Sequence, residues 1–303
     1  MKHLFIVNPT AGGRDKTDEV RAKVEAAFNG RDEEYEIYVT RAPMDATQKI
    51  ISEAASGAHL RVYACGGDGT FNECVCGAAG HDNVALCPFP TGTGNDFCRM
   101  FGAEGELFRE LDALLDGTER PIDLIDCNGR WCANICSVGI DARIGTSVHK
   151  YSALPLIGGA AAYVVSAVVN MFKGISTNMY IKCGDYYAEG PHTLICACNG
   201  RFYGGGFNPT LNARPDDGEL DFIIVRKVSL LTFARLISKY AAGRADEFPK
   251  YVTHLKGRDI EIAFDEEDVI NLDGEGIFAN KVCMHLVPGA ARLIVPRGMK
   301  FFD

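Results

Sequence analysis

Short apolar runs alternate with amphipathic segments through the first 115 residues of the chain. Apolar runs bounded by turn residues predict strands, and apolar positions repeating every three or four residues predict helices. The expected strands are residues 4–7, 36–40, 60–65 and 84–87, and the expected helices are 16–28, 45–55, one from about 71, and 105–115. This alternation predicts a doubly wound α/β domain with a parallel sheet, whose ligands bind outside the carboxyl ends of the strands.

The second half of the chain has a different pattern, in which short strands follow one another with few helices between them. Only residues 160–172 and 229–242 have a helical pattern there. The expected strands are residues 120–126, 131–138, 178–183, 193–198, 220–225, 260–264, 269–272 and 282–287. Such a series predicts an antiparallel β-sandwich or barrel.

The change of pattern places the domain boundary near residues 121–126. We expect an α/β nucleotide-binding domain over residues 1–122 and a β-rich domain over residues 123–287. Residues 288–303 include an apolar run that we expect to return to the first domain. A cleft between two such domains is the expected ligand site.

Composition excludes several classes of protein. The 303 residues are 47% hydrophobic and 23% charged, which excludes a disordered chain. The net charge of −9 argues against broad binding of nucleic acid backbones. The 12 cysteines form no Cys-x-x-Cys pair, and the first residues resemble a strand rather than a signal peptide. We therefore expect reduced, mostly buried thiols in a cytoplasmic protein without a zinc site.

Two segments bear on membranes. Residues 151–172 carry no charge, but Pro155, Gly158 and Gly159 interrupt them, and the remaining helix would span about 21 Å, short of the ~30 Å hydrocarbon core. We expect a buried or membrane-grazing helix there rather than a membrane span. Residues 227–244 form an apolar helix face edged by cations, which could touch an anionic membrane, although packing on the second domain is favoured.

Three glycine-rich turns follow strands of the first domain. They are Asn-Pro-Thr-Ala-Gly-Gly at 8–13, Gly-Gly-Asp-Gly-Thr-Phe-Asn-Glu at 66–73 and Pro-Thr-Gly-Thr-Gly-Asn-Asp-Phe at 90–97. Bare backbone N–H groups in such turns suit phosphate oxygens, and Thr70 is a candidate N-cap of the next helix. Ordinary turns and helix caps are the alternative. The sequence matches neither the Walker A loop nor the dinucleotide fingerprint.

Two acidic turns lie in the second half. Arg-Pro-Asp-Asp-Gly-Glu at 214–219 can hold a hard divalent ion, although turn chemistry explains it equally well. Asn-Leu-Asp-Gly-Glu at 271–275 can supply a general base, with a hairpin turn as the alternative. The seven histidines show no spacing typical of metal ligands, and no Gly-x-Ser-x-Gly motif supports a serine hydrolase.

In this order, the three glycine-rich motifs resemble the catalytic domain of the diacylglycerol kinase and sphingosine kinase superfamily. The segments at 134–142, 199–207, 214–218 and 273–275 resemble its soluble bacterial lipid kinase branch, so the resemblance covers nearly the whole chain. Gly-Gly-Asp-Gly-Thr also occurs in NAD kinases and phosphofructokinase-like folds. The resemblance implies such an N-terminal domain and transfer of phosphate from ATP, with Mg²⁺, to a lipid hydroxyl.

The resemblance also implies roles for individual residues. Glu275 matches the general base, and Asp68 would connect through hydrogen bonds and water to the active magnesium. Asp217 matches a structural magnesium ligand, while Arg214 and Glu219 stand where the family uses backbone carbonyls. The matched nucleotide contacts are Asn8, Thr10, Gly12, Thr40, Gly66, Gly67, Asp68, Gly69, Thr70, Asn72 and Thr93.

The expected reaction is phosphorylation of diacylglycerol to phosphatidic acid in phospholipid metabolism. Alternatives are a sphingoid base or other lipid alcohol, an NAD or small-molecule kinase, and a nucleotide-binding regulator without activity. The carboxylates of Asp68, Asp217 and Glu275 argue against the last. We expect a cytoplasmic enzyme that visits the inner face of the membrane and binds no nucleic acid, with a homodimer left open.

Overall fold

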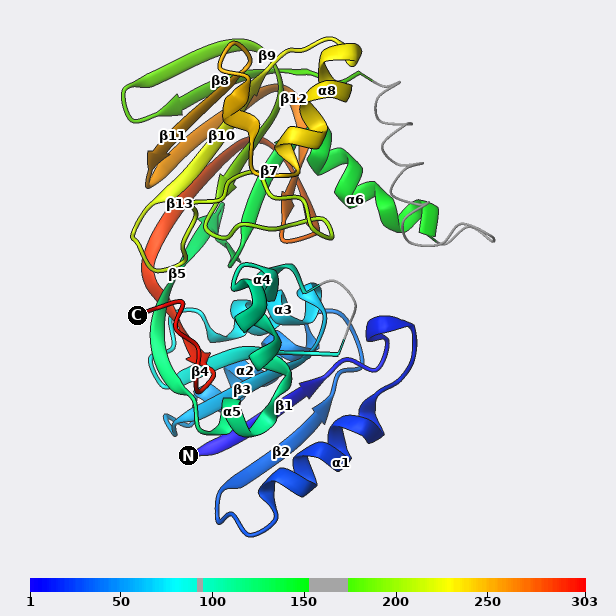
Figure 1. Ribbon diagram of the computed structural model, residues 1–303, viewed down its shortest axis with the longest axis vertical. Helices are drawn as coiled ribbons and strands as arrows, with labels where there is room; N and C mark the ends of the chain where they lie inside the picture. The colour runs from blue at the N-terminus through cyan, green and yellow to red at the C-terminus, as the bar shows by residue number, and fades with distance from the viewer. Residues whose placement is uncertain (92–94, 153–173) are drawn as a thin grey trace. The chain divides into compact units, whose positions relative to one another are not determined.

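The computed structural model describes residues 1–91, 95–152 and 174–303 (Figure 1). The chain divides into two compact units, Met1–Leu124 with Val287–Asp303, and Ile125–Leu286. Strands β5 (Thr118–Cys127) and β13 (Glu275–Val295) carry the chain from one unit to the other. Each unit is described by itself below.

The first unit is built on a parallel sheet in the order β2-β1-β3-β4-β13. Its apolar strands β1, β3 and β4 are almost wholly buried, as expected for strands covered on both faces. The C-terminal part of β13 lies beside β4, with Arg292 opposite Ala85. The elements are β1 (Lys2–Val7), η1 (Ala11–Gly13), α1 (Thr17–Phe28), β2 (Glu34–Val39), α2 (Asp45–Ala54), β3 (Leu60–Gly66), α3 (Asp68–Ala78), β4 (Val84–Pro90), α4 (Asp96–Arg99), η2 (Gly102–Arg109) and α5 (Leu111–Leu115).

These elements confirm the predicted α/β class, with two differences. Helix α3 begins at Asp68 with Gly67 as its N-cap residue, so the expectation that Thr70 caps this helix was wrong. Thr70 is instead buried in the first turn of the helix. The single helix expected over residues 105–115 is split, because Glu110 adopts an extended conformation between η2 and α5.

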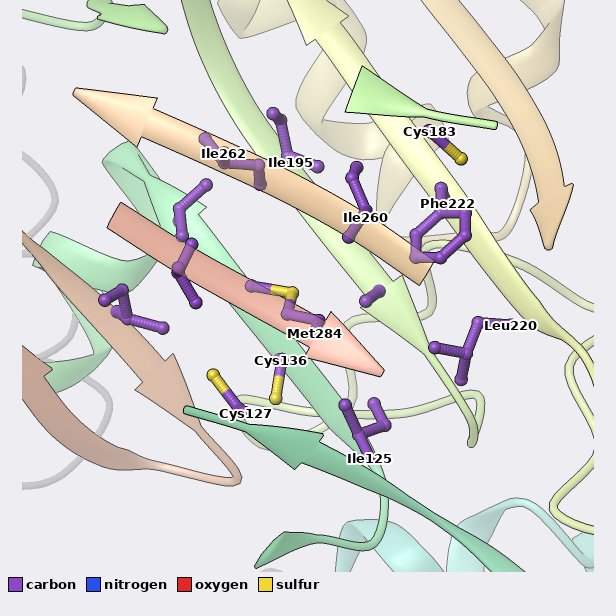
Figure 2. Close-up of a cluster of buried hydrophobic side chains, with 14 of the residues drawn as sticks. Ile125, Cys127, Cys136, Cys183, Ile195, Leu220, Phe222, Ile260, Ile262 and Met284 are labelled. Carbon is purple, nitrogen blue, oxygen red and sulfur yellow. The ribbon is translucent and has the colours of Figure 1, made fainter. Parts of the chain in front are cut away.

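The second unit is antiparallel, as predicted. Strand β9 pairs with β7, β7 with β12, β12 with β8, and β8 again with β9, so these four strands close on themselves. Figure 2 shows the apolar side chains of this unit's core, among them Phe222, Ile260 and Met284. The elements are β6 (Arg130–Cys132), β7 (Ile135–Gly139), α6 (Ile140–Ser152), β8 (Thr177–Cys183), β9 (Tyr186–Cys198), β10 (Leu220–Arg226), α8 (Leu230–Tyr240), η3 (Ala245–Glu247), β11 (Val252–Gly257) and β12 (Asp259–Leu272).

Helix α6 and strand β11 were not predicted from the sequence. The pattern of α6 is concealed because a glycine, a threonine and two serines stand among its apolar positions, of which Ile140 and Ile144 are buried. The strands expected at 260–264 and 269–272 form one strand, β12, whose pairing shifts between Ala263 and Asp268. The helix expected at 160–172 lies outside the described residues.

In the part of the chain that the structure describes, no helix is both long and apolar enough to cross a membrane. All twelve cysteines are free thiols, as expected; ten are buried, Cys76 is half-buried and Cys283 is exposed. Burial raises the pKa of the Cys65, Cys87 and Cys196 thiols well above the ordinary value.

Candidate functional site

The carboxyl ends of the parallel strands in the first unit surround a cavity of about 270 Å³. Polar groups reach this cavity from the segments that follow β1, β2 and β3. Among the residues that line the cavity are Asn8, Thr10, Thr40, Arg41, Thr70 and Glu73. The structure therefore brings together four of the residues that the sequence assigned to nucleotide binding.

Asn8 joins the first glycine-rich turn to the second. Its Nδ2 donates to Oγ1 of Thr70 at 3.1 Å, and its Oδ1 accepts from the backbone N and Oγ1 of Thr10 at 3.0 and 2.8 Å. Gly66 makes this approach sterically feasible, because a Cβ atom there would lie 2.2 Å from Oγ1 of Thr70. Gly12 has a φ of 72°, in the left-handed region that glycine adopts without strain.

Asp68 joins the second turn to the third. Its Oδ1 accepts from the backbone N–H of Asp96 at 2.6 Å and of Phe97 at 3.5 Å. The N–H of Thr91 also donates to the carbonyl oxygen of Gly66 at 3.0 Å. All three turns are thus linked in sequence order. Thr93 lies outside the described residues, so its predicted contact is not addressed by the structure.

The start of α3 is open enough for a ligand to approach the backbone. A Cβ atom on Gly67 or Gly69 would meet nothing within 4 Å. The first turn of an α-helix leaves backbone N–H groups without intrahelical partners, and these groups favour anions. Asn72, one turn further on, is buried, and its Oδ1 accepts a hydrogen bond from the Cys76 thiol in the next turn of α3.

Arg41 and Glu73 were not among the predicted site residues. Arg41 directly follows Thr40, which the resemblance selected, and the rule that ligands bind at the carboxyl ends of parallel strands could have found it. Asp45 fixes the loop by accepting from the backbone N of Arg41 and from the Tyr38 hydroxyl, each at 2.8 Å. These two hydrogen bonds hold the pKa of Asp45 below its ordinary value.

In the second unit, residues 273 and 274 form the two-residue turn between β12 and β13. The carboxylate of Asp273 accepts from the backbone N–H groups of Ala133, Asn134 and Ile135 at 2.8, 3.2 and 2.9 Å. Asp273 is therefore a structural anchor. Glu275, two residues further on, is exposed, and no hydrogen bond or ion pair of its side chain is found within the described residues.

A buried polar cluster lies between α6 and α8. The Tyr203 hydroxyl donates to the Asp141 carboxylate at 2.8 Å and lies 2.9 Å from the Tyr240 hydroxyl, which is 2.8 Å from the Cys196 sulfur. Burial raises the pKa of Asp141 to about 6, although hydrogen bonds from Tyr203 and Ser137 act in the opposite direction. From the sequence, Asp141 was assigned no role beyond its place in a motif.

Side chains alone do not form a metal site in the turn at 214–219. The described residues contain no group of three or more histidine, cysteine, aspartate or glutamate side chains arranged to hold a metal ion. The guanidinium of Arg214 binds Asp216 instead. The ammonium of Lys256 lies 4.0 Å from Asp217, 3.4 Å from Glu219 and 3.9 Å from Asp221, so a positive charge already lies among these carboxylates.

Known proteins match this chain over nearly its whole length. A model of the diacylglycerol kinase catalytic domain matches residues 2–127, and one of the YegS C-terminal NAD kinase beta sandwich-like domain matches residues 134–295. A "Probable lipid kinase YegS-like" of Pseudomonas aeruginosa is 31% identical, over 98% of this chain and 95% of its own length. A protein of the same name from Stenotrophomonas maltophilia is 28% identical, over 97% and 96%.

The crystal structure of a diacylglycerol kinase from Bacillus anthracis has the same fold. It superposes with a TM-score of 0.72 at 23% identity, covering 99% of this chain and 98% of that one. Both domain matches and the identity to full-length relatives agree with the motifs at the sheet edge. The chain therefore belongs to the bacterial diacylglycerol kinase-like lipid kinase family.

Proposed function

We propose that this lipid kinase transfers the γ-phosphoryl group of ATP, bound as its magnesium complex, to the hydroxyl of diacylglycerol, giving phosphatidic acid. Two observations support the nucleotide part: residues of the first two glycine-rich turns line one cavity, and hydrogen bonds link these turns to each other and to the third. Phosphoryl transfer depends mainly on positioning and charge neutralisation, and backbone N–H groups with a metal-bound substrate supply both.

The residues of the first unit fit a nucleotide. Asn8, Thr10, Thr40 and Thr70 offer amide and hydroxyl groups to sugar or phosphate oxygens. Arg41 adds a positive charge to the same cavity. The open flank of α3 at Gly67 and Gly69 allows phosphate oxygens to approach the helix N-terminus. Asp68, held by the α4 backbone, is proposed to orient the water shell of the magnesium ion that enters with ATP.

Glu275 is proposed as the general base. Its exposed carboxylate accepts the proton of the lipid hydroxyl as that oxygen forms a bond to the γ-phosphorus. The bond from the γ-phosphorus to the β,γ-bridging oxygen breaks, and ADP leaves. A carboxylate positioned as general base typically raises the reaction rate about 10²–10⁴-fold.

A structural Mg²⁺ in the turn at 214–219 is a separate proposal. Asp217 would supply a carboxylate oxygen, and the backbone carbonyls of Arg214 and Glu219 would complete the protein ligands. Burial raises the pKa of Asp217, and the ammonium of Lys256 competes for the same carboxylate. Mg²⁺ would bind there by displacing Lys256.

The function is tested by incubating the protein with γ-labelled ATP, Mg²⁺ and, separately, diacylglycerol, sphingosine or NAD. We expect label in phosphatidic acid, recovered in the organic phase, and incorporation at least about 10²-fold slower when Asp68→Asn replaces the wild type. Labelling of sphingosine alone would support the sphingoid-base alternative. Labelling of NAD alone, or of no acceptor, would contradict lipid phosphorylation by this chain.

A further inference from the structure

The N-terminal end of α8 carries two exposed leucines. Leu230 and Leu231 are 56% and 65% exposed, although leucine normally contributes to the core. The other face of α8 is buried through Phe233, Leu236 and Tyr240, so the helix is already anchored on its own unit. Packing among the described residues of this unit therefore leaves the two leucines uncovered.

Positive charges flank these leucines along the chain. Arg226 and Lys227 precede the helix and Arg235 follows Leu231 by one turn, all three exposed and without an ion pair among the described residues. The backbone N–H of Arg226 donates to the carbonyl oxygen of Tyr251, so the neighbouring exposed Lys250 lies at the same end of the β10–β11 pair.

The sequence from residue 226 to 244 contains five cations and no acid, in a chain whose net charge is −9. Two of the five, Lys239 and Arg244, are bound to Glu247 near the far end of α8. The unpaired charges are thus concentrated at the end of the helix that bears Leu230 and Leu231.

We propose that this patch, formed by Leu230, Leu231, Arg226, Lys227 and Arg235, docks the protein on an anionic lipid bilayer. Exposed leucines can enter the boundary between headgroups and acyl chains, while the cations bind anionic headgroups. The inference rests on the proposed function, because a diacylglycerol acceptor resides in a membrane. The inference goes beyond that function because it specifies which face of the second unit binds the membrane.

Vesicle cosedimentation tests the patch without any kinase reaction. The vesicles contain phosphatidylcholine alone or phosphatidylcholine with phosphatidylglycerol, and no diacylglycerol. We expect the wild type to bind only the anionic vesicles, and binding to weaken with salt. Leu230→Gln/Leu231→Gln should lower the affinity at least tenfold, and Arg226→Gln/Lys227→Gln by about 25-fold, at about fivefold per charge.

The matched control is Tyr187→Gln/Lys182→Gln, which removes one exposed apolar residue and one exposed cation from strands β9 and β8. It should bind like the wild type. The proposal is overturned if either patch variant binds the anionic vesicles as tightly as the wild type. It is also overturned if the control loses as much affinity as the patch variants, or if the wild type does not bind anionic vesicles.

A second assay separates this proposal from the proposed function. The patch variants should phosphorylate a water-dispersed short-chain diacylglycerol at the wild-type rate, but long-chain diacylglycerol in anionic vesicles at least tenfold more slowly. If the wild type phosphorylates no diacylglycerol, the proposed function fails while vesicle binding still tests the patch. If the patch variants lose activity on both substrates equally, docking by this patch is contradicted.

Discussion

The carboxylate of Asp68 accepts a hydrogen bond from the backbone N–H of Asp96 at 2.6 Å, so a proposed catalytic carboxylate also caps the helix after the third glycine-rich turn. These two roles can be separated by substitution. Asparagine keeps an oxygen that accepts the hydrogen bond but loses the negative charge, whereas alanine loses both.

We expect Asp68→Asn to reduce kcat by about 10²-fold or more, because a positioned charge at the reacting phosphate is removed. Its melting temperature should stay within a few degrees of the wild type. Asp68→Ala should lose the activity and also about 1 kcal/mol of stability, the usual contribution of such a cap. Calorimetry with a kinase assay measures both. Full activity of Asp68→Asn would remove this residue from the mechanism.

Glu275→Gln tests the general base. The side chain is exposed and makes no hydrogen bond within the described residues, so the melting temperature should not change. We expect kcat to fall about 10²–10⁴-fold while ATP binding, measured by calorimetric titration, remains. Turnover at the wild-type rate would show that another group accepts the proton.

Asp273→Ala is the structural counterpart, two residues away. It leaves the buried N–H groups of Ala133, Asn134 and Ile135 without their acceptor. A buried N–H group without an acceptor costs about 1–3 kcal/mol, so we expect the free energy of unfolding to fall by about 3 kcal/mol or more. Urea unfolding should show this as a lower midpoint. An unchanged midpoint would mean that the turn relaxes and satisfies these groups otherwise.

Lys256→Gln tests the competition in the turn at 214–219. Removing the ammonium leaves Asp217, Glu219 and Asp221 without their shared cation, so millimolar Mg²⁺ should stabilise this variant more than the wild type. An increase of about 2–4 °C in melting temperature corresponds to about 1 kcal/mol of free energy of unfolding for a domain of this size. Adding Asp217→Asn should abolish the shift. Identical Mg²⁺ responses in all three proteins would rule out a metal there.

The Asp141 cluster predicts a pH dependence of stability. Because burial raises its folded-state pKa to about 6, from an ordinary value of 3.8, the folded state binds more protons than the unfolded state between these values. This residue's contribution to stability therefore falls as the pH rises from about 4 to 6. Asp141→Asn should gain melting temperature relative to the wild type over that range. A constant difference between the two proteins would contradict the raised pKa.

The sequence predicted the α/β and β-rich classes and the strand-end loops because those depend on local periodicity and glycine spacing. It could not predict that Asp68 caps α4 or that Asp273 anchors residues 133–135, since both contacts join distant parts of the chain. The buried partners of Asp141 and the position of Lys256 arise likewise from strand pairing, which a single sequence does not reveal. Helix α6 was missed because its polar positions mask its buried face.

The distribution of the twelve thiols gives the protein an internal reporter. With Cys283 exposed, Cys76 half-buried and ten others buried, a chromogenic thiol reagent should modify Cys283 first in the native protein. Slow modification of the remaining thiols then measures how often the two cores open. Substituting Cys283 by serine, followed by counting the thiols that still react, would distinguish local opening from global unfolding without an engineered probe.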